Sequence, residues 1–142
     1  MKSAQRSGAI IVGASSGIGA ALARELAPRG YALALVARRA AALDALSAEI
    51  NQRANANIAY AYPHDVRDYS AAPDLYVHIT RALEAAGAPV RVLVYVAGIM
   101  PPPDNEDSWS FEDERAMLET NTLGAVRWLA LGAETFAHSG HG

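Results

Sequence analysis

Residues 9–19 read Ala-Ile-Ile-Val-Gly-Ala-Ser-Ser-Gly-Ile-Gly, and this stretch decides the fold. Its first part, Ala9–Val12, is a short continuous apolar run, as expected for a strand that is buried on both faces. A turn rich in glycine and serine follows from Gly13 to Gly19. The apolar residues after this turn recur at helical spacing until Pro28 and Gly30 end the helix. A buried strand, a glycine-rich turn and a helix in this order predict the start of a parallel α/β sheet.

The alternation of strand and helix continues along the chain. The sequence predicts further strands over Tyr31–Ala37, Ile58–Tyr62 and Val90–Val96 and further helices over Ala40–Arg53, Leu75–Ala86 and Ser110–Phe136. Pro101–Asn105 is rich in proline and is predicted as a loop. Four strand–helix alternations indicate right-handed crossovers and a parallel sheet with helices on both faces.

Length and composition are those of one folded domain. The chain has 142 residues, 51% of them apolar, and a formal net charge of −3. These values exclude an intrinsically disordered chain and give no broad basic surface for nucleic acid or for a membrane. The chain has no cysteine, which excludes disulfides and thiolate zinc sites. We predict a single domain over residues 1–142, with no nucleic-acid partner, no membrane partner and no metal site.

The N-terminus has some features of a secretory signal. Lys2 and Arg6 precede an uncharged stretch, Gly8–Ala23, that ends in small residues. Glycine and serine interrupt that stretch, however, and it continues directly into a helix with Arg24 and Glu25. No apolar run approaches the roughly 18 residues that a membrane span needs. We therefore expect a cytoplasmic protein.

The glycine-rich turn has the composition of a loop that holds phosphate. Glycine allows a tight turn, lets the backbone approach a pyrophosphate, and lets the helix pack closely on the strand. The start of the helix presents free N–H groups and the positive end of its dipole to the anion. A plain tight turn is the alternative, and the flanking strand and helix favour the phosphate loop. The residues assigned to this loop are Gly13, Ser15, Ser16, Gly17, Ile18 and Gly19.

The glycine spacing, G-x-x-x-G-x-G, resembles that of the short-chain dehydrogenase/reductase (SDR) family. Three further segments resemble the family's motifs, in the family's order. Asp65-Val66 looks like the Asp-Val pair whose carboxylate meets the adenine, and Ala97-Gly98 looks like the second half of Asn-Asn-Ala-Gly. Asn121–Gly124 resembles the Asn-x-x-Gly segment, whose Asn is the first member of the catalytic tetrad. The resemblance covers nearly the whole chain and implies an oxidoreductase that moves hydride between a dinucleotide and a carbonyl or alcohol substrate.

The end of the second predicted strand favours NADP(H) over NAD. Sites for NAD usually place an acidic residue about 20 residues after the glycine loop, where it holds the ribose 2′-hydroxyl. Arg38 and Arg39 occupy that position instead. Because a guanidinium binds phosphate through two parallel hydrogen bonds, we predict NADP(H), with NAD less favoured. Two arginines that only lie in solvent are the alternative, and a methyltransferase, which generally has an acidic residue here, is disfavoured.

Most of the SDR catalytic tetrad has no matching residue in the chain. The resemblance implies Asn, Ser, Tyr and Lys, with the lysine of a Tyr-x-x-x-Lys motif lowering the pKa of the tyrosine. None of the six tyrosines is followed four positions later by lysine, since Lys2 is the only lysine. Asn121 alone has a counterpart, and the family's Ser lies on a fifth strand beyond the position of Gly142. We expect the chain to carry the cofactor-binding, N-terminal part of an SDR domain and to be inactive alone.

Several residues depart from the family pattern or are ambiguous. Val12 stands where the family's glycine motif usually opens with Thr, and Tyr95-Val96 replaces two asparagines. His64 beside Asp65 suggests an acid/base pair, but a loop histidine at a strand end is the favoured interpretation. The last helix often faces a subunit partner in the family, so Trp128 or Phe136 could be interfacial.

These observations predict an α/β fold, an incomplete Rossmann-like doubly wound sheet in the order 3-2-1-4. The fourth strand would be an apolar edge, which soluble proteins normally avoid, so we expect a marginally stable or associating chain. A homo-oligomer through the last helix is the expected partner, besides the small-molecule substrate. The alternative function is a nucleotide-binding or interaction module without catalysis.

Overall fold

The computed structural model describes residues 6–102, 110–140 and 142. Its four parallel strands lie in the order β3-β2-β1-β4, which confirms the predicted Rossmann-like α/β fold with an incomplete sheet. The strands are β1 (Ser7–Val12), β2 (Tyr31–Ala37), β3 (Ala59–Pro63) and β4 (Val90–Tyr95). The helices are α1 (Gly17–Leu26), the 3₁₀ turn η1 (Ala27–Arg29), α2 (Ala40–Ala54), α3 (Ala72–Ala85), α4 (Phe111–Met117), the π-helical η2 (Leu118–Leu123) and α5 (Gly124–Ser139). Of the predicted loop Pro101–Asn105, residues 103–105 lie outside the described residues.

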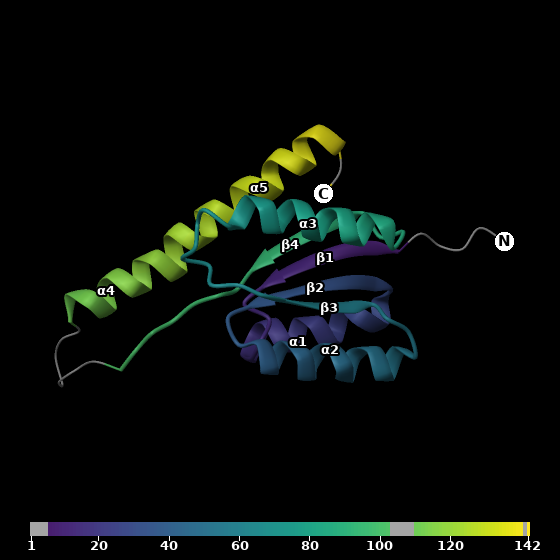
Figure 1. Cartoon of the computed structure of the whole chain (residues 1–142), viewed down its shortest axis with the longest axis horizontal. Helices are drawn as coiled ribbons and strands as arrows, with labels where there is room; N and C mark the ends of the chain where they lie inside the picture. Colours follow the sequence, from purple (N-terminus) through teal and green to yellow (C-terminus); the bar gives the residue numbers. More distant parts are fainter. Residues whose placement is uncertain (1–5, 103–109, 141) are drawn as a thin grey trace.

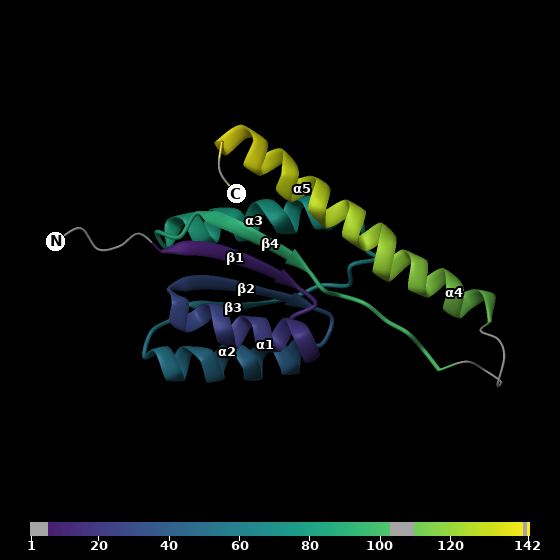
Figure 2. The same cartoon turned by 180° about the vertical axis from the view of Figure 1, so that it is seen from behind.

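Helices cover both faces of the sheet, with α1 and α2 on one face and α3 and α5 on the other (Figures 1 and 2). Alternate residues of the two central strands point to the two layers. Ile11 and Leu35 pack on the α1–α2 side, Ile10 and Val36 pack on the α3–α5 side, and all four are fully buried. Burial on both faces is why β1 and β2 read as continuous apolar runs. Each such aliphatic side chain stabilises the fold by about 1.5–3 kcal/mol.

Strand β4 is an edge of the described sheet and is less buried than the central strands. It pairs with β1 on one side, and its residues after Val90 are only half-buried. Leu93 and Tyr95 pack on the α3–α5 side, and Val92 packs on the other. The predicted apolar edge is therefore present in the described part of the chain, while marginal stability and association stay predictions.

Helix α3 begins earlier than the sequence predicts. It starts at Ala72 rather than at Leu75. The carboxylate of Asp68 accepts a hydrogen bond from the Ala71 N–H at 3.1 Å, which fixes the turn before the helix. Pro73 then occupies one of the first helical positions, where a missing N–H costs no hydrogen bond.

The segment predicted as one helix over Ser110–Phe136 is interrupted. Ser110 caps it as expected, since its hydroxyl accepts from the Asp113 N–H at 3.2 Å. At Leu118 the α-helix passes into the π-helical η2, and α5 follows from Gly124. The π-helical segment is only six residues long and lies between two α-helices, so the sequence pattern was interpreted as one continuous helix.

Candidate cofactor-binding site

The glycine-rich loop leaves β1 and turns tightly over the end of the sheet. The N–H of Gly13 bonds to the Val36 carbonyl at 2.8 Å, and Gly13 has φ +99°, in the region that favours glycine. A Cβ at Gly13 would overlap the backbone of Ala97, and one at Gly19 would overlap the Gly13 carbonyl. These two glycines therefore allow the loop to lie against the end of β4 and the helix to lie against the loop.

Gly17 differs from the other two glycines of the motif. It has φ +53°, and a Cβ there would meet no atom within 4 Å. It is the first residue of α1, where backbone N–H groups have no partner within the helix. The backbone at Gly17 is thus open on the side where an anion would approach the positive end of the helix dipole.

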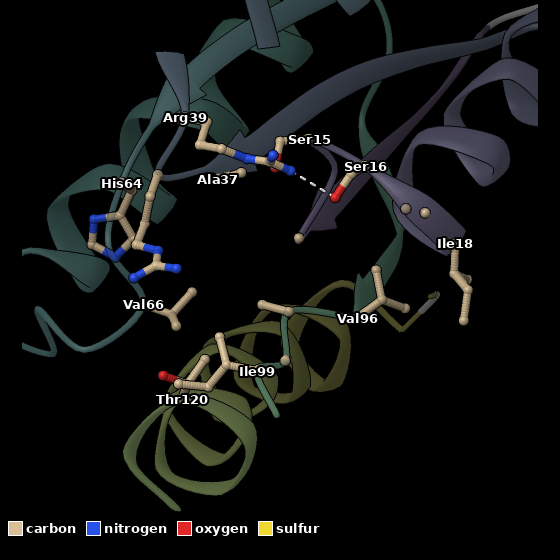
Figure 3. Close-up of a pocket in the computed structure, with 16 residues that line it drawn as sticks. Ser15, Ser16, Ile18, Ala37, Arg39, His64, Val66, Val96, Ile99 and Thr120 are labelled. Atoms are coloured by element: carbon tan, nitrogen blue, oxygen red, sulfur yellow. Dashed lines mark hydrogen bonds between the residues drawn. The ribbon is translucent and has the colours of Figure 1, made fainter. Parts of the chain in front are cut away.

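A cavity of about 320 Å³ opens beside this loop, at the carboxyl ends of β1, β2 and β4 (Figure 3). Open parallel sheets generally bind ligands at this edge, at the point where the strand order reverses. Eleven of the predicted site residues line the cavity: Gly13, Ser15, Ser16, Gly17, Ile18, Gly19, Arg38, Arg39, Val66, Ala97 and Gly98. Five residues that were not assigned to the site also line it: Ala37, His64, Val96, Ile99 and Thr120. Asp65 and Asn121 lie next in sequence to lining residues but do not line the cavity themselves.

Arg39 reaches from the end of β2 across to the glycine-rich loop (Figure 3). Its Nη2 donates to the Ser16 hydroxyl at 2.7 Å and to the Ser15 hydroxyl at 3.1 Å. Within the described ranges, neither Arg38 nor Arg39 forms an ion pair with a carboxylate. Among the described residues, the cavity wall therefore carries two guanidinium groups that form no ion pair with a carboxylate, next to two hydroxyls and the start of a helix.

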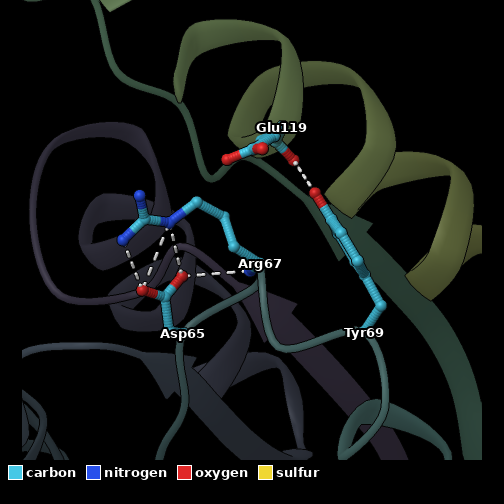
Figure 4. Close-up of polar contacts among 4 residues, drawn as sticks. All are labelled: Asp65, Arg67, Tyr69 and Glu119. Carbon is cyan, nitrogen blue, oxygen red and sulfur yellow. Dashed lines mark hydrogen bonds and ion pairs between the residues drawn. The ribbon is translucent and has the colours of Figure 1, made fainter. Parts of the chain in front are cut away.

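Asp65 forms an ion pair with Arg67, a neighbour that was not predicted to contact it. Arg67 Nη2 lies 2.8 Å from Asp65 Oδ2, and the Arg67 N–H donates to Asp65 Oδ1 at 3.0 Å (Figure 4). The hydrogen bond from the Arg67 side chain, above all, lowers the pKa of Asp65 to about 2. The expected adenine contact is thus an ionised carboxylate already shared with Arg67, and the Asp-x-Arg spacing is the signal that could have shown this.

His64 lies on the cavity wall as well as at a strand end. Its ring meets the ring of Trp128 edge to face, with centroids 5.6 Å apart. Burial lowers the pKa of His64, against the opposing effect of Asp68 and Asp65. A loop histidine with no site role was the favoured interpretation of His64, because nothing in the sequence places position 64 against Trp128.

Asn121 lies in η2, and both its amide oxygen and its amide nitrogen form hydrogen bonds with one residue of the loop after β4. Its Oδ1 accepts from the Ile99 N–H, and its Nδ2 donates to the Ile99 carbonyl, both at 2.8 Å. Ile99 lines the cavity, so Asn121 shapes the wall through it. The tetrad role of Asn121 stays a prediction.

Two other kinds of feature are absent from the described residues. None of their helices is both long and apolar enough to span a bilayer. Across the same residues, no group of three or more histidine and acidic side chains gathers where it could hold a metal ion. The donors that do gather at the cavity are backbone N–H groups, hydroxyls and guanidiniums, which together suit an anionic ligand.

Comparison with known proteins agrees with this geometry. A family model described as short chain dehydrogenase matches residues 7–142. Sulfoacetaldehyde reductase 2 of Chromohalobacter salexigens is 32% identical over 133 residues, which are 94% of this chain and 50% of that protein. The 2,3-dihydro-2,3-dihydroxybenzoate dehydrogenase of Bacillus subtilis is 38% identical over 116 residues, 82% of this chain and 42% of that protein. The chain spans about half the length of the curated relatives that it matches.

Solved structures show the same relationship. An alcohol dehydrogenase from the archaeon Thermococcus sibiricus, complexed with 5-hydroxy-NADP, superposes with a TM-score of 0.76 at 32% identity, covering 96% of this chain and 55% of that one. An actinorhodin polyketide ketoreductase with NADPH gives a TM-score of 0.75 at 29% identity, covering 92% of this chain and 48% of that one. The glycine-rich loop, the sheet order and these matches agree, and the chain belongs to the short-chain dehydrogenase/reductase family of oxidoreductases.

Proposed function

We propose that this chain binds NADP(H) in the cavity beside the glycine-rich loop and forms the cofactor-binding part of an oxidoreductase that acts on a carbonyl or alcohol. The observation that carries the proposal is the pair Arg38 and Arg39, which line the cavity without a partner carboxylate among the described residues. A 2′-phosphate distinguishes NADP from NAD, and arginine is the side chain best shaped to hold it. The relatives solved with NADPH and with 5-hydroxy-NADP support the same choice.

The residues around the cavity fit the parts of a dinucleotide. The open backbone at Gly17 and the start of α1 suit the pyrophosphate, because a side chain would fill that space. The hydroxyls of Ser15 and Ser16, already bonded to Arg39, suit the 2′-phosphate beside it. Val66 and Asp65 follow β3 at the position expected for the adenine, where Arg67 and the base would share the Asp65 carboxylate.

The chain's own contribution to the reaction would be binding and orientation. NADPH supplies hydride when it is bound. Ala97, Gly98 and Ile99 would form the wall on the β4 side of the cofactor. Asn121 holds the Ile99 backbone at both its N–H and its carbonyl, so it would keep that wall in a fixed position.

We further propose that the chain of 142 residues binds the cofactor without turning over a carbonyl. The family's Tyr-x-x-x-Lys has no match here, since Lys2 is the only lysine. Tyr95, the tyrosine at the end of β4, is no substitute for it, because burial raises its pKa to about 12. A module that binds nucleotide and takes no part in any oxidoreductase is the second candidate, and oxidoreductase activity of a longer protein that contains this chain would exclude it.

The proposal is tested by titrating NADPH and NADH into the chain and into its Arg39→Gln variant, with cofactor fluorescence as the signal. We expect Arg39→Gln to weaken NADPH binding about tenfold to a hundredfold, since a hydrogen bond to a charged group is lost. NADH binding should change little, because NADH has no 2′-phosphate. Arg29→Gln is the matched control, since Arg29 is exposed on η1 and pairs only with Glu25 among the described residues. Equal weakening of both cofactors by Arg39→Gln would contradict the assigned role.

We also propose that the protein is cytoplasmic.

We propose, separately, that α5 mediates association with a second copy of the chain. Trp128 does not support the association, because it is fully buried against His64 and Tyr76 within the chain. The opposite side of α5 carries an exposed apolar stripe at helical spacing. It consists of Val126, Leu129, Ala130, Ala133 and Ala137. Val126 is 62% exposed and Leu129 46%, so burying them in an interface would remove apolar area from water.

A further inference from the structure

The π-helical segment η2 receives hydrogen bonds from two tyrosine hydroxyls outside it. In a π-helix each N–H bonds to the carbonyl five residues earlier, and here the Gly124 N–H bonds to the Glu119 carbonyl. The hydroxyl of Tyr69, in the loop between β3 and α3, donates to the same carbonyl at 3.1 Å (Figure 4). The hydroxyl of Tyr95, at the end of β4, donates to the next carbonyl, that of Thr120. Donors from two distant parts of the chain therefore bind consecutive carbonyls of one turn.

Asn121 follows in the same turn and connects it to the cavity. Its amide bonds to both the N–H and the carbonyl of Ile99, and Ile99 and Thr120 line the cavity. A shift of η2 by one residue, from π-helical to α-helical bonding, would rotate Asn121 by about 100° about the helix axis. The position of the Ile99 backbone thus depends on the register of η2.

Both tyrosines are themselves held in place. The Arg127 side chain on α5 donates from Nε to the Tyr69 carbonyl at 3.2 Å, which ties the loop of Tyr69 to the helix. A side chain at Gly124 would overlap the Tyr95 hydroxyl, so Gly124 is what lets this hydroxyl reach the Thr120 carbonyl. The Tyr95 phenol is protonated at neutral pH and is therefore a donor, and burial raises its pKa further above the ordinary value.

We propose that Tyr69 and Tyr95 are positioning residues that hold η2 in its π-helical register and so fix Asn121 and Ile99 at the wall of the cavity. Tyr95 stands where the family motif has asparagine, so this arrangement belongs to this chain's own sequence. The proposal deepens the proposed function and rests on it only for the identity of the ligand that the wall would contact. The positioning itself is a property of the free chain.

The test is amide hydrogen exchange, resolved at Ile99, in the full chain and in its Tyr95→Phe and Tyr69→Phe variants. Each variant keeps the ring and removes one hydroxyl. We expect either variant to speed exchange at Ile99 about two- to tenfold, the effect of losing one neutral hydrogen bond on a local opening. Tyr60→Phe is the matched control, because the hydroxyl of Tyr60, in the edge strand β3, also donates to a backbone carbonyl, that of Asn57 in the preceding loop, at 3.0 Å. The Tyr60→Phe variant should leave the exchange rate of the Ile99 amide unchanged.

Three results would overturn the proposal. The first is unchanged Ile99 exchange in both variants, and the second is an equal effect of Tyr60→Phe. The third is a uniform rise that includes the amides of β1 and β2, since this would show a global loss of stability. Should Tyr95→Phe not fold, Tyr69→Phe alone decides. A parallel NADPH titration of the unaltered chain keeps the two proposals separate. If the chain does not bind NADPH, the proposed function is contradicted, whereas the hydrogen-exchange result still tests the role of the two tyrosines.

Discussion

The two sides of the cavity are built in opposite ways. On the β1–β2 side, the glycine-rich loop and the arginines come from one stretch of fewer than 30 residues, Gly13–Arg39, and the two strands are buried except at their first residues. On the β4 side, Ile99 and Asn121 are 22 positions apart and are joined by hydrogen bonds between side chain and backbone. Strand β4 itself is half-buried. One side is therefore specified by local sequence and the other by contacts that exist only in the folded chain.

The largest effect should come from the β1–β2 side. We predict that Gly19→Ala lowers the free energy of unfolding by about 3 kcal/mol or more, because its Cβ would overlap the Gly13 backbone, which cannot move freely. Gly17→Ala is the matched control. Its Cβ meets open space, so it should cost only about 1–2 kcal/mol, for a positive φ. Urea unfolding of both variants measures the difference, and equal losses would show that the loop is not close-packed as described.

The next effect concerns the β4 side and the helix that covers it. We predict that Val126→Lys shifts the self-association midpoint of the chain at least about tenfold toward the monomer, because a charge would enter the proposed interface on α5. Val77→Lys, a change of the same kind at an exposed valine on α3, should leave association unchanged. Sedimentation velocity over a range of concentrations measures both. An unaltered chain that is monomeric at every concentration would contradict the proposed interface.

The smallest effect concerns Asp65, in the segment that follows β3. Its pKa is lowered to about 2 by Arg67, so the pair stabilises the fold above about pH 4, and this stabilisation is lost as the pH falls toward 2. We predict that Arg67→Gln raises the pKa of Asp65 toward its ordinary value near 3.8. Because both side chains are more than one-third exposed, the loss of stability at neutral pH should stay below about 1 kcal/mol.

Carbon-detected NMR of the Asp65 carboxyl group follows this titration directly. The control is Arg29→Gln, which leaves the Asp65 pair intact. An Asp65 carboxyl that still titrates near pH 2 in Arg67→Gln would show that Arg67 is not the cause of the lowered pKa.

The same contrast explains what the sequence could predict. Apolar runs, glycine spacing and the two arginines after β2 indicated the α/β fold and eight of the sixteen lining residues, because buried strands and tight turns leave a local signature. Three more, Val66, Ala97 and Gly98, came from the resemblance to the SDR motifs. The π-helical register of η2 leaves no such local signature in the sequence, because its hydrogen-bond partners Tyr69 and Tyr95 are about 50 and 25 residues away in sequence. The pairing of Asp65 with Arg67 was local, and was missed because the carboxylate was interpreted through the family motif alone.

The most direct test of the central claim is the affinity of the unaltered chain for NADPH and for NADH under the same conditions. Two guanidiniums at the cavity wall predict that NADPH binds at least about tenfold more tightly, with the difference shrinking as salt rises because the contacts are ionic. Isothermal titration at low and at high salt measures both affinities. Equal affinities for the two cofactors, or binding of neither, would contradict the claim that Arg38 and Arg39 form an NADP(H) site.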